Sequence, residues 1–324
     1  MIERFLELGY EVVVVAPDED YSSRLKEIGC TTMLVCLDNK GLNPLRDLST
    51  IFHLWGIYRK QQPAFAFHFT VKSVIYGTIV GNLLGVRCVN TVTGLGTAFI
   101  GNRWSRKIVG TLYKCIKDRA QWTFFQNDED FNLFRENCYV RSDRASVVAG
   151  AGINLPQFAF SPSEPNSFFR FLYLGRLLFD KGLLELKEAA KQITECRSDV
   201  RVQILGPIES KNPTAINPTT LNAWIEEESI EYLGETDDVS EFIVKADCIV
   251  LPSFREGTPR SLLEAAAIGR PIVATDVPGC REVVIDEKNG FLCQPGSVEE
   301  LVEAMQKMLN LTHEQRLAMG QAGR

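Results

Sequence analysis

The sequence predicts an α/β fold in two domains, because apolar runs of strand length alternate with helical patterns along the whole chain. The alternation stops once, in residues 156–168, where Pro, Ser and Asn gather without a sustained period, and then restarts. A chain of 324 residues can form two units that each bury a core. We therefore predict an N-terminal domain at 1–155, a linker at 156–168 and a C-terminal domain at 169–324.

Each element is predicted from its pattern: strands from runs rich in β-branched and aromatic residues, helices from apolar residues spaced by three and four. A short helix that ends at Gly9 opens the chain. The predicted strands are 12–16, 32–35, 64–67, 87–91, 122–126 and 145–148, then 170–174, 201–205, 230–233, 246–251 and 271–274. The predicted helices are 22–28, 48–61, 73–84, 105–119 and 129–137, then 182–192, 219–227, 239–245, 259–268 and 298–309.

Strands joined by helices form parallel sheets, so we expect two Rossmann-like domains that face each other across a cleft, with a ligand at the carboxyl ends of the strands. The chain begins with a helix that leads into a strand and stops in mid-pattern at "AMGQAGR". We expect the first strand of the N-terminal domain and the last helix of the C-terminal domain to be missing.

The composition narrows the class of function. A net charge of −6 argues against nucleic-acid binding by the whole chain. Nine cysteines without a CxxC pair indicate a reducing cytoplasm, and three histidines make a His-rich metal centre improbable. The longest apolar stretch, residues 73–86, is shorter than the roughly 20 residues that span a bilayer.

The stretch "FREGTPRSLLEAAAIGRPIVATD" places Glu256 in a loop and Glu264 two turns inside the following helix. Thr258 is the predicted N-cap and Pro259 the first helical residue, so backbone N–H groups of the first turn would face a ligand and favour an anion. The spacing suits contacts to two parts of one elongated ligand. A capped surface helix with ordinary acids explains the same spacing.

The stretch "YLGRLLFDKG" ends a predicted strand at Leu174, after which Gly175 frees the backbone. Arg176 and Lys181 follow in one loop, where two cations can neutralise a diphosphate. Taken alone, the pair is equally typical of solvated surface cations.

Together, "GRLLFDKG", "LPSFREGTPRSLLEAAAIGRPIVATDVPGCREVV" and "NGFLCQPG" resemble the donor half of the retaining glycosyltransferases of family 4, which have the GT-B fold. Glu256 and Glu264 match the family's E-x7-E signature. "HFTVKSVIYG", "VNTVTGLGTAFIGN" and "NPTAINPTTL" resemble a subgroup that extends sugars on polyprenyl diphosphate for bacterial capsule, O-antigen and protein glycosylation.

The resemblance implies roles for individual residues. Arg176 and Lys181 would hold the nucleotide diphosphate, and Glu256 would contact the transferred sugar. Glu264 would bind the ribose hydroxyls, and Gly175 is predicted as a further residue of the donor-binding site. Backbone N–H groups in the segment Gly257, Thr258, Pro259 and Arg260 would lie near sugar and phosphates, and His68 would touch the donor sugar. A histidine satisfied by its own loop is the alternative for His68.

The acceptor and membrane side is predicted in the N-terminal half. Gly94 and Gly96 would belong to an acceptor loop, because the third glycine of a dinucleotide fingerprint is missing there. Lys72, Arg103, Arg106 and Lys107 are the predicted basic residues of this side, the last three in an amphipathic segment that suits an anionic membrane surface. A helix packed on its own sheet is the alternative.

No cofactor and no metal are expected. The resemblance implies that cations and a helix N-terminus stabilise the departing diphosphate without a metal. Asp18-Glu19-Asp20 and Asp128-Glu129-Asp130 look like an Asp-x-Asp metal motif, and we interpret them as solvated acids and helix caps.

The predicted function is a retaining, metal-independent glycosyltransferase, peripheral at the inner, cytoplasmic face of the cell membrane. Its predicted substrates are a UDP-sugar donor of hexose or N-acetylhexosamine and a polyprenyl-diphosphate-linked saccharide acceptor, with an anionic membrane surface as a partner and no nucleic acid. Two alternatives remain: a non-catalytic UDP-sugar-binding fragment, and a non-hydrolysing UDP-sugar 2-epimerase. The transferred sugar, the acceptor linkage and the oligomeric state do not follow from the sequence.

Overall fold

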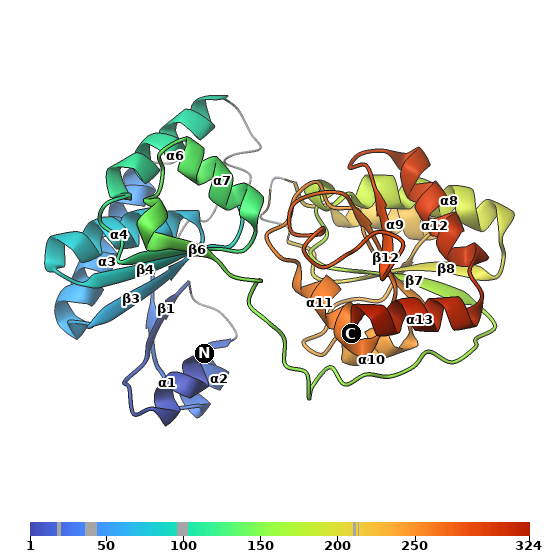
Figure 1. Cartoon of the computed structure of the whole chain (residues 1–324), viewed down its shortest axis with the longest axis horizontal. Coiled ribbons are helices and arrows are strands. Elements are labelled where there is room, and N and C mark those ends of the chain that lie inside the picture. The colour runs from blue at the N-terminus through green and yellow to red at the C-terminus, as the bar shows by residue number, and fades with distance from the viewer. Residues whose placement is uncertain (18–20, 36–43, 96–102, 210–211, 213) are drawn as a thin grey trace. The chain divides into compact units, whose positions relative to one another are not determined.

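The computed structural model describes residues 1–17, 21–35, 44–95, 103–209, 212 and 214–324, without the side chains of residues 21, 22, 103 and 105. The chain divides into two compact units (Figure 1). Unit 1 comprises Met1–Phe125 and Phe131–Ser146, and unit 2 comprises Gln126–Asp130 and Val147–Arg324. Both are built from strands and helices in alternation, which confirms the predicted α/β class.

Among its described residues, unit 1 holds a four-stranded sheet in the order β3-β4-β5-β6 and a two-stranded sheet, β1-β2. The strands are β1 (Val13–Ala16), β2 (Thr31–Leu34), β3 (Phe65–Phe69), β4 (Arg87–Val92), β5 (Trp122–Phe125) and β6 (Ala145–Val147). The helices are α1 (Ile2–Glu7), α2 (Tyr21–Glu27), α3 (Pro44–Gln61), α4 (Val71–Leu84), α6 (Arg103–Ile116), α7 (Asp128–Glu136, which starts in unit 2) and the 3₁₀ turn η1 (Ser142–Arg144). The single sheet expected here is thus two, because no described strand carries ladder hydrogen bonds from β1-β2 to β3.

Unit 2, as far as it is described, is one six-stranded parallel sheet in the order β12-β11-β10-β7-β8-β9. The strands are β7 (Phe169–Leu174), β8 (Val200–Leu205), β9 (Glu231–Tyr232), β10 (Cys248–Leu251), β11 (Ile272–Thr275) and β12 (Gly290–Cys293). The helices are η2 (Phe179–Lys181, 3₁₀), α8 (Leu183–Cys196), α9 (Pro218–Glu226), α10 (Ser240–Lys245), α11 (Arg260–Ile268), α12 (Val298–Asn310) and α13 (His313–Gly323). Helices α8 and α12 cover one face of the sheet, and α10, α11 and α13 cover the other (Figure 1).

Two elements of unit 2 were not predicted. β12 is four residues long and begins at a glycine, so its pattern is too short to separate from a turn. α13 begins at a capping box, in which the Thr312 side chain accepts from the Gln315 N–H and the Gln315 side chain accepts from the Thr312 N–H. That capping pair was the available sequence signal.

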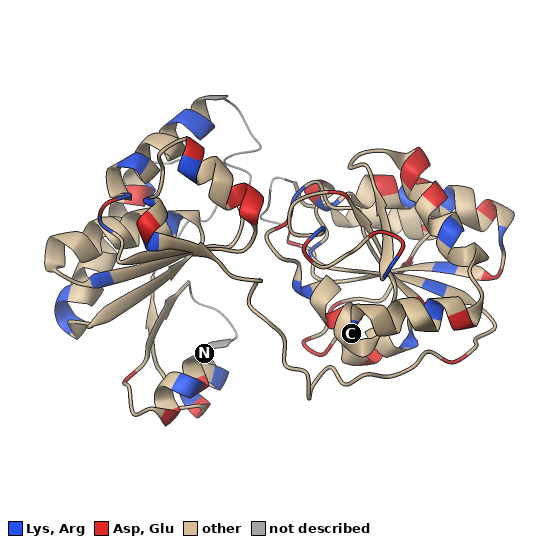
Figure 2. Ribbon diagram, in the orientation of Figure 1, with Lys and Arg blue, Asp and Glu red and all other residues tan. Residues whose placement is uncertain are grey.

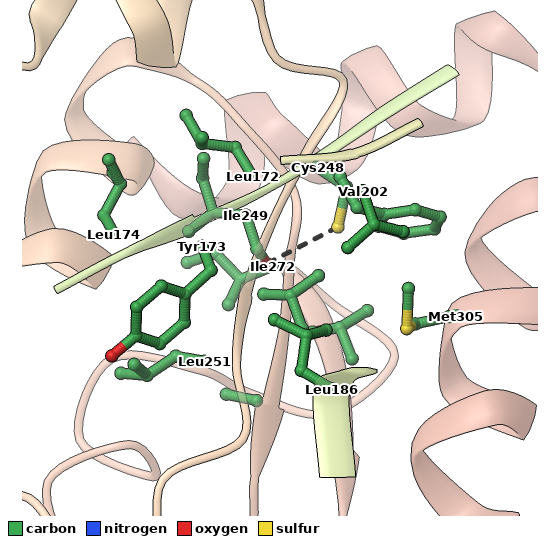
Figure 3. Close-up of a cluster of buried hydrophobic side chains, with 14 of the residues drawn as sticks. Leu172, Tyr173, Leu174, Leu186, Val202, Cys248, Ile249, Leu251, Ile272 and Met305 are labelled. Atoms are coloured by element: carbon green, nitrogen blue, oxygen red, sulfur yellow. Dashed lines mark hydrogen bonds between the residues drawn. The ribbon is translucent and has the colours of Figure 1, made fainter. Parts of the chain in front are cut away.

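The core of unit 2 is formed by the apolar residues of the strands and the helix faces that pack on them. Leu172 and Ile249 lie on neighbouring strands, and Leu186 and Met305 come from α8 and α12 (Figure 3). All four are essentially inaccessible to solvent. Strands buried on both faces read as continuous apolar runs, which is why the sequence predicted them well.

The predicted linker is part of unit 2 instead of a connection between units. It has no helix or strand, as expected, but Phe158 is buried in the core, and the Ser161 N–H donates to the Ile268 carbonyl at 3.0 Å. Arg270, 1% exposed, donates to the carbonyls of Ser161, Ile243 and Val244. The division between the units therefore falls at Ser146/Val147, before the predicted 155. The polar composition of residues 156–168 did not indicate this packing, because only Phe158 and backbone groups make the contacts.

Arg270 ties three segments of unit 2 together, so Arg270→Met should destabilise this unit. The substitution leaves three buried or part-buried carbonyls without their donor, and we expect a loss of about 3 kcal/mol in the free energy of unfolding, measured in urea. Arg197→Met is the matched control, because Arg197 pairs only locally with Asp199 at the surface. Equal stability of the two variants would contradict the assigned role.

Candidate active site

The predicted site residues of the C-terminal half gather at one edge of unit 2. The strands are parallel, so their carboxyl ends meet at that edge. Three loops leave from there and are called the strand-end loops: residues 175–182 after β7, 252–260 after β10 and 276–281 after β11. They carry the predicted residues Gly175, Arg176, Lys181, Glu256, Gly257, Thr258, Pro259 and Arg260, and Glu264 follows on α11.

Tyr173 supports the first strand-end loop from below. Its side chain is completely buried in the core of unit 2 (Figure 3). Its phenol hydroxyl donates a hydrogen bond to the Arg176 carbonyl at 2.8 Å. The Gly175 N–H donates to the Leu205 carbonyl on the neighbouring strand at 3.1 Å. The backbone under Arg176 is thereby held, while its side chain is 51% exposed and pairs with Glu209 at 3.3 Å. Sequence reasoning missed Tyr173, although a Tyr that ends an apolar strand needs a polar partner.

Lys181 ends the short turn η2, which is pressed against the second strand-end loop. Gly182 follows with φ of 72°, and a Cβ there would lie 1.9 Å from the Pro252 carbonyl oxygen, so no other residue fits. The Phe254 N–H donates to the Asp180 carbonyl at 3.2 Å. The two loops are therefore joined through their backbones.

Lys181 and Glu256 meet directly at this junction. Lys181 Nζ lies 2.5 Å from Glu256 Oε1, and their side chains are 18% and 12% exposed. Behind them lie the buried Tyr173 and Cys280, and burial raises the pKa of both groups well above the usual range, so both are uncharged at neutral pH. Lys181 and Glu256 are 75 positions apart in the sequence and form an ion pair, so they lie together in the structure.

The helix after Glu256 starts one residue later than predicted. α11 begins at Arg260, and Pro259 is the N-cap without a side-chain hydrogen bond. Thr258, the predicted cap, donates instead to the Gln126 carbonyl of the same unit at 3.2 Å, because its hydroxyl points away from the helix. The prediction of Thr258 as the cap is wrong. Among the described residues, no side chain caps the first turn of α11, so its N–H groups can donate hydrogen bonds to an anion.

Glu264 lies on the first turns of α11 and is 8% exposed. Arg260 Nη2 is 3.3 Å from Glu264 Oε1, one helical turn earlier. Burial raises the pKa of the Glu264 carboxyl above its usual value, and Arg260 partly offsets this effect. A nearly buried carboxylate at the edge of the site is suited to accept hydrogen bonds from hydroxyl groups of a ligand.

The third strand-end loop packs under the second. Gly279, with φ of 84°, comes so close that a Cβ would lie 1.9 Å from the Gly257 carbonyl oxygen. Cys280 is fully buried next to Glu256 and Lys181. Sequence reasoning gave this loop no role, although Pro278-Gly279 directly after a strand signals a tight turn.

The three acids at 128–130 form the start of α7, and they differ in burial and in their partners. Asn127 Oδ1 accepts from the Asp130 N–H at 2.7 Å and caps α7. Asp130 is buried and paired with Arg255, and Glu129 lies 3.2 Å from Arg281. The interpretation as solvated acids is wrong for Asp130, because Arg255 takes the place of solvent. Asp18-Glu19-Asp20 lies outside the described residues.

His68 is a packed residue of unit 1. Alternation along β3 buries Ala66 and His68 and exposes the phenylalanines between and beside them. The ring is 5% exposed, with Nδ1 at 2.8 Å from Asn90 Oδ1 and Nε2 at 2.7 Å from Tyr58 Oη. Asn90 Oδ1 can only accept, so Nδ1 carries the proton and Nε2 accepts from Tyr58. Both ring nitrogens thus have protein partners, which fits the alternative of a histidine satisfied by its surroundings, and the contact with a donor sugar stays a prediction.

The predicted basic residues of unit 1 separate into two groups. Lys72 lies 2.6 Å from Asp47, with side chains 12% and 13% exposed, so the two form a largely buried ion pair, and a role of Lys72 on the acceptor or membrane side stays a prediction. Lys107 and Arg106 are on the exposed side of α6, while Val109 and Tyr113 are buried on its other side. Gly94 has φ of 137° just after β4. Gly96 and the Arg103 side chain lie outside the described residues.

The comparisons with known proteins identify the family. Residues 156–324, more than half of the chain, match the family described as glycosyl transferases group 1. The chain belongs to this family. Residues 1–127 match glycosyl transferase 4-like proteins. The protein is therefore a glycosyltransferase, and the resemblance drawn from "GRLLFDKG" and the E-x7-E stretch is confirmed.

Two curated relatives match the glycosyltransferase over most of their length. It is 26% identical over 316 residues to the N,N'-diacetylbacillosaminyl-diphospho-undecaprenol alpha-1,3-N-acetylgalactosaminyltransferase of Campylobacter jejuni, covering 92% of this chain and 82% of the relative. It is 27% identical over 295 residues to the UDP-Gal:alpha-D-GlcNAc-diphosphoundecaprenol alpha-1,3-galactosyltransferase of Escherichia coli, covering 84% and 74%.

Solved structures show the fold of the glycosyltransferase. Anabaena HepE in complex with UDP and glucose superposes with a TM-score of 0.79 at 15% identity, over 99% of this chain and 88% of HepE. The sucrose-phosphate synthase of Thermosynechococcus elongatus gives 0.81 at 18% identity, over 99% and 85%. These likenesses establish the predicted GT-B fold class.

His68 makes the stability of the glycosyltransferase depend on pH. Burial lowers the pKa of the ring from 6.5 to about 4, so between these values the unfolded chain binds a proton that the folded chain does not. Stability is therefore full above pH 6.5 and is lost as the pH falls toward 4, by about 2 kcal/mol between pH 7 and pH 5. Urea unfolding at both pH values should show this loss in the wild type and not in His68→Gln.

His53→Gln, on the exposed face of α3, is the matched control for the loss of a histidine. A wild-type slope that persists unchanged in His68→Gln would show that the ring of His68 is not the group responsible.

Proposed function

We propose that this glycosyltransferase is a retaining, metal-independent enzyme that moves a hexose or N-acetylhexosamine from a UDP-sugar to a saccharide carried on polyprenyl diphosphate. It would act in the synthesis of bacterial surface polysaccharides, peripherally at the inner face of the cell membrane. The observation that carries the proposal is the junction of the strand-end loops, where Lys181 pairs with Glu256 just before the start of α11, and Arg176 lies in the same loop as Lys181.

The donor is proposed from the chemistry of that junction. Lys181, Arg176 and the N–H groups of the first turn of α11 are the groups that bind a diphosphate. Glu256 would accept hydroxyl protons of the sugar, and Glu264 those of the ribose. UDP as the nucleotide is supported by the complexes of HepE with UDP and with UDP-glucose and by the UDP-Gal named for the Escherichia coli relative.

The proposed chemistry needs charge stabilisation at the leaving group. As the bond from the anomeric carbon to the phosphate oxygen breaks, negative charge grows on the diphosphate, where Lys181 and Arg176 already lie. The acceptor hydroxyl oxygen would bond to the anomeric carbon from the side that the phosphate leaves, and its proton would pass to a diphosphate oxygen. This front-side route retains configuration and assigns the neutralising role to protein cations in place of a metal.

The acceptor is proposed from the relatives and from α6. Both curated relatives are named for sugars on diphospho-undecaprenol. In this chain, α6 exposes Trp104 (72%) and Ile108 (46%) beside the exposed Lys107 and Lys114, and Figure 2 shows basic positions along this helix. Apolar residues flanked by cations suit the surface of an anionic bilayer. Among the helices that the structure describes, none has the length and apolarity needed to cross a bilayer.

A transfer assay tests the donor, the acceptor and metal independence together. The purified protein is incubated in EDTA with UDP-Gal, UDP-GlcNAc or UDP-GalNAc and polyprenyl-diphosphate-linked GlcNAc, and the lipid product is separated and quantified. We expect one donor to give an α-linked, lipid-bound disaccharide. Arg176→Ala should slow transfer by about 100-fold, since one charge-stabilising contact of the transition state is lost. Glu264→Ala should mainly weaken UDP binding in calorimetry.

Arg197→Ala is the matched control, because it removes an exposed arginine of the same unit away from the strand-end loops. Turnover that requires added Mg²⁺ would contradict metal independence, and a β-linked product would contradict retention. Consumption of UDP-sugar without lipid product would favour the epimerase, and UDP binding without turnover would favour the non-catalytic fragment.

The membrane face of α6 has its own test. Lys107→Glu removes one exposed positive charge and adds a negative one. Since each basic residue near an anionic surface contributes about 1 kcal/mol, we expect at least about fivefold weaker binding to vesicles with anionic lipid. Co-sedimentation measures it, with Lys307→Glu on α12 of unit 2 as the matched control. Equal binding of both variants would show that α6 is not the membrane surface.

A further inference from the structure

The cations of the candidate site are each paired with an acid of the same unit. Arg176 lies 3.3 Å from Glu209, Lys181 lies 2.5 Å from Glu256, and Arg260 lies 3.3 Å from Glu264. These are the groups proposed to receive the donor. A diphosphate that enters the site therefore competes with carboxylates that are already in place.

The three pairs differ in burial, and burial decides what their rupture costs. Arg176 and Arg260 are 51% and 71% exposed, so water and salt compensate for the loss of either pair. Lys181 and Glu256 are both less than one-fifth exposed. A partly desolvated carboxylate that loses its cation is strongly disfavoured unless a new hydrogen-bond donor replaces it.

The groups described around Glu256 do not supply a second cation that could replace Lys181. The neighbours behind it, Tyr173 and Cys280, are uncharged, and the phenol proton of Tyr173 is used by the Arg176 carbonyl. The backbone of this loop has little space to move, because Gly279 packs closely against the Gly257 carbonyl and Gly182 packs closely against the Pro252 carbonyl. Glu256 therefore needs hydrogen bonds from the ligand when Lys181 turns to a phosphate.

We propose that the Lys181–Glu256 pair couples recognition of the two ends of the donor, so that the intact nucleotide sugar is bound in preference to the free nucleotide diphosphate. A UDP-sugar brings phosphate oxygens for Lys181 and hydroxyl protons for Glu256, so both partners are satisfied at once. UDP supplies only the first and leaves Glu256 without a cation. The pair thereby discriminates substrate from product, an inference that rests on the proposed function.

Calorimetric titration with UDP and with the UDP-sugar that gives transfer tests the coupling, in the wild type, Glu256→Gln and Glu209→Gln. Glu256→Gln removes the competitor for Lys181, so UDP should bind about tenfold tighter than to the wild type, while the UDP-sugar gains nothing or binds more weakly. The preference for UDP-sugar over UDP should thus fall by about tenfold or more. Glu209→Gln removes the same charge from an exposed pair and should change either affinity by less than about threefold.

Glu256→Ala should show the same tightening of UDP, and serves if Glu256→Gln does not fold. Unchanged or weaker UDP binding in the variants would overturn the coupling, as would an equal change for UDP and the UDP-sugar. If the wild type still binds UDP in those cases, only the coupling is overturned and the proposed function is not. Failure of the folded wild type to bind any UDP compound would overturn the proposed function and the coupling together.

Discussion

The ion pair between Lys181 and Glu256 is the interaction on which the candidate site depends. It joins the loop after β7 to the loop after β10, and both loops can meet only because glycine occupies position 182. From this junction the other groups take their places: Arg176 above the Tyr173 phenol, α11 directly after Pro259, and the third loop beneath through Gly279. Close backbone approach at Gly182 and Gly279 is what allows this ion pair to form.

In the structure without a ligand, Arg176, Lys181 and Arg260 are each paired with a carboxylate. A cluster of unpaired cations would bind any anion, phosphate and free nucleotide included. Pairing each cation with a carboxylate reserves strong binding for a ligand that can satisfy both charges. This arrangement also fits a leaving group that must be stabilised while charge develops and then released, because the acids compete for the cations once the product has formed.

Polar groups inside unit 1 serve packing. His68 links β3 to α3 through Tyr58 and to β4 through Asn90, and Lys72 links α4 to α3 through Asp47. Each pair satisfies groups that would be costly to bury alone. The resemblance assigned His68 to the donor sugar, and Lys72 was placed on the acceptor or membrane side. In the structure both side chains are largely buried and bonded to neighbouring side chains.

The sequence by itself determined the order of strands and helices, the α/β class and the residues of the donor motifs, because period, turn residues and spacing are local properties of the chain. It could not place β12 and α13, whose patterns are short or weakly amphipathic, nor the division between the units, since residues 156–168 pack through one buried ring and backbone groups. Only the tertiary structure decided that Thr258 is no cap, that His68 and Lys72 are internal, and that Lys181 faces Glu256. Those outcomes depend on which groups meet across many residues of sequence, and burial and pairing of that kind arise only when the strands have assembled into sheets.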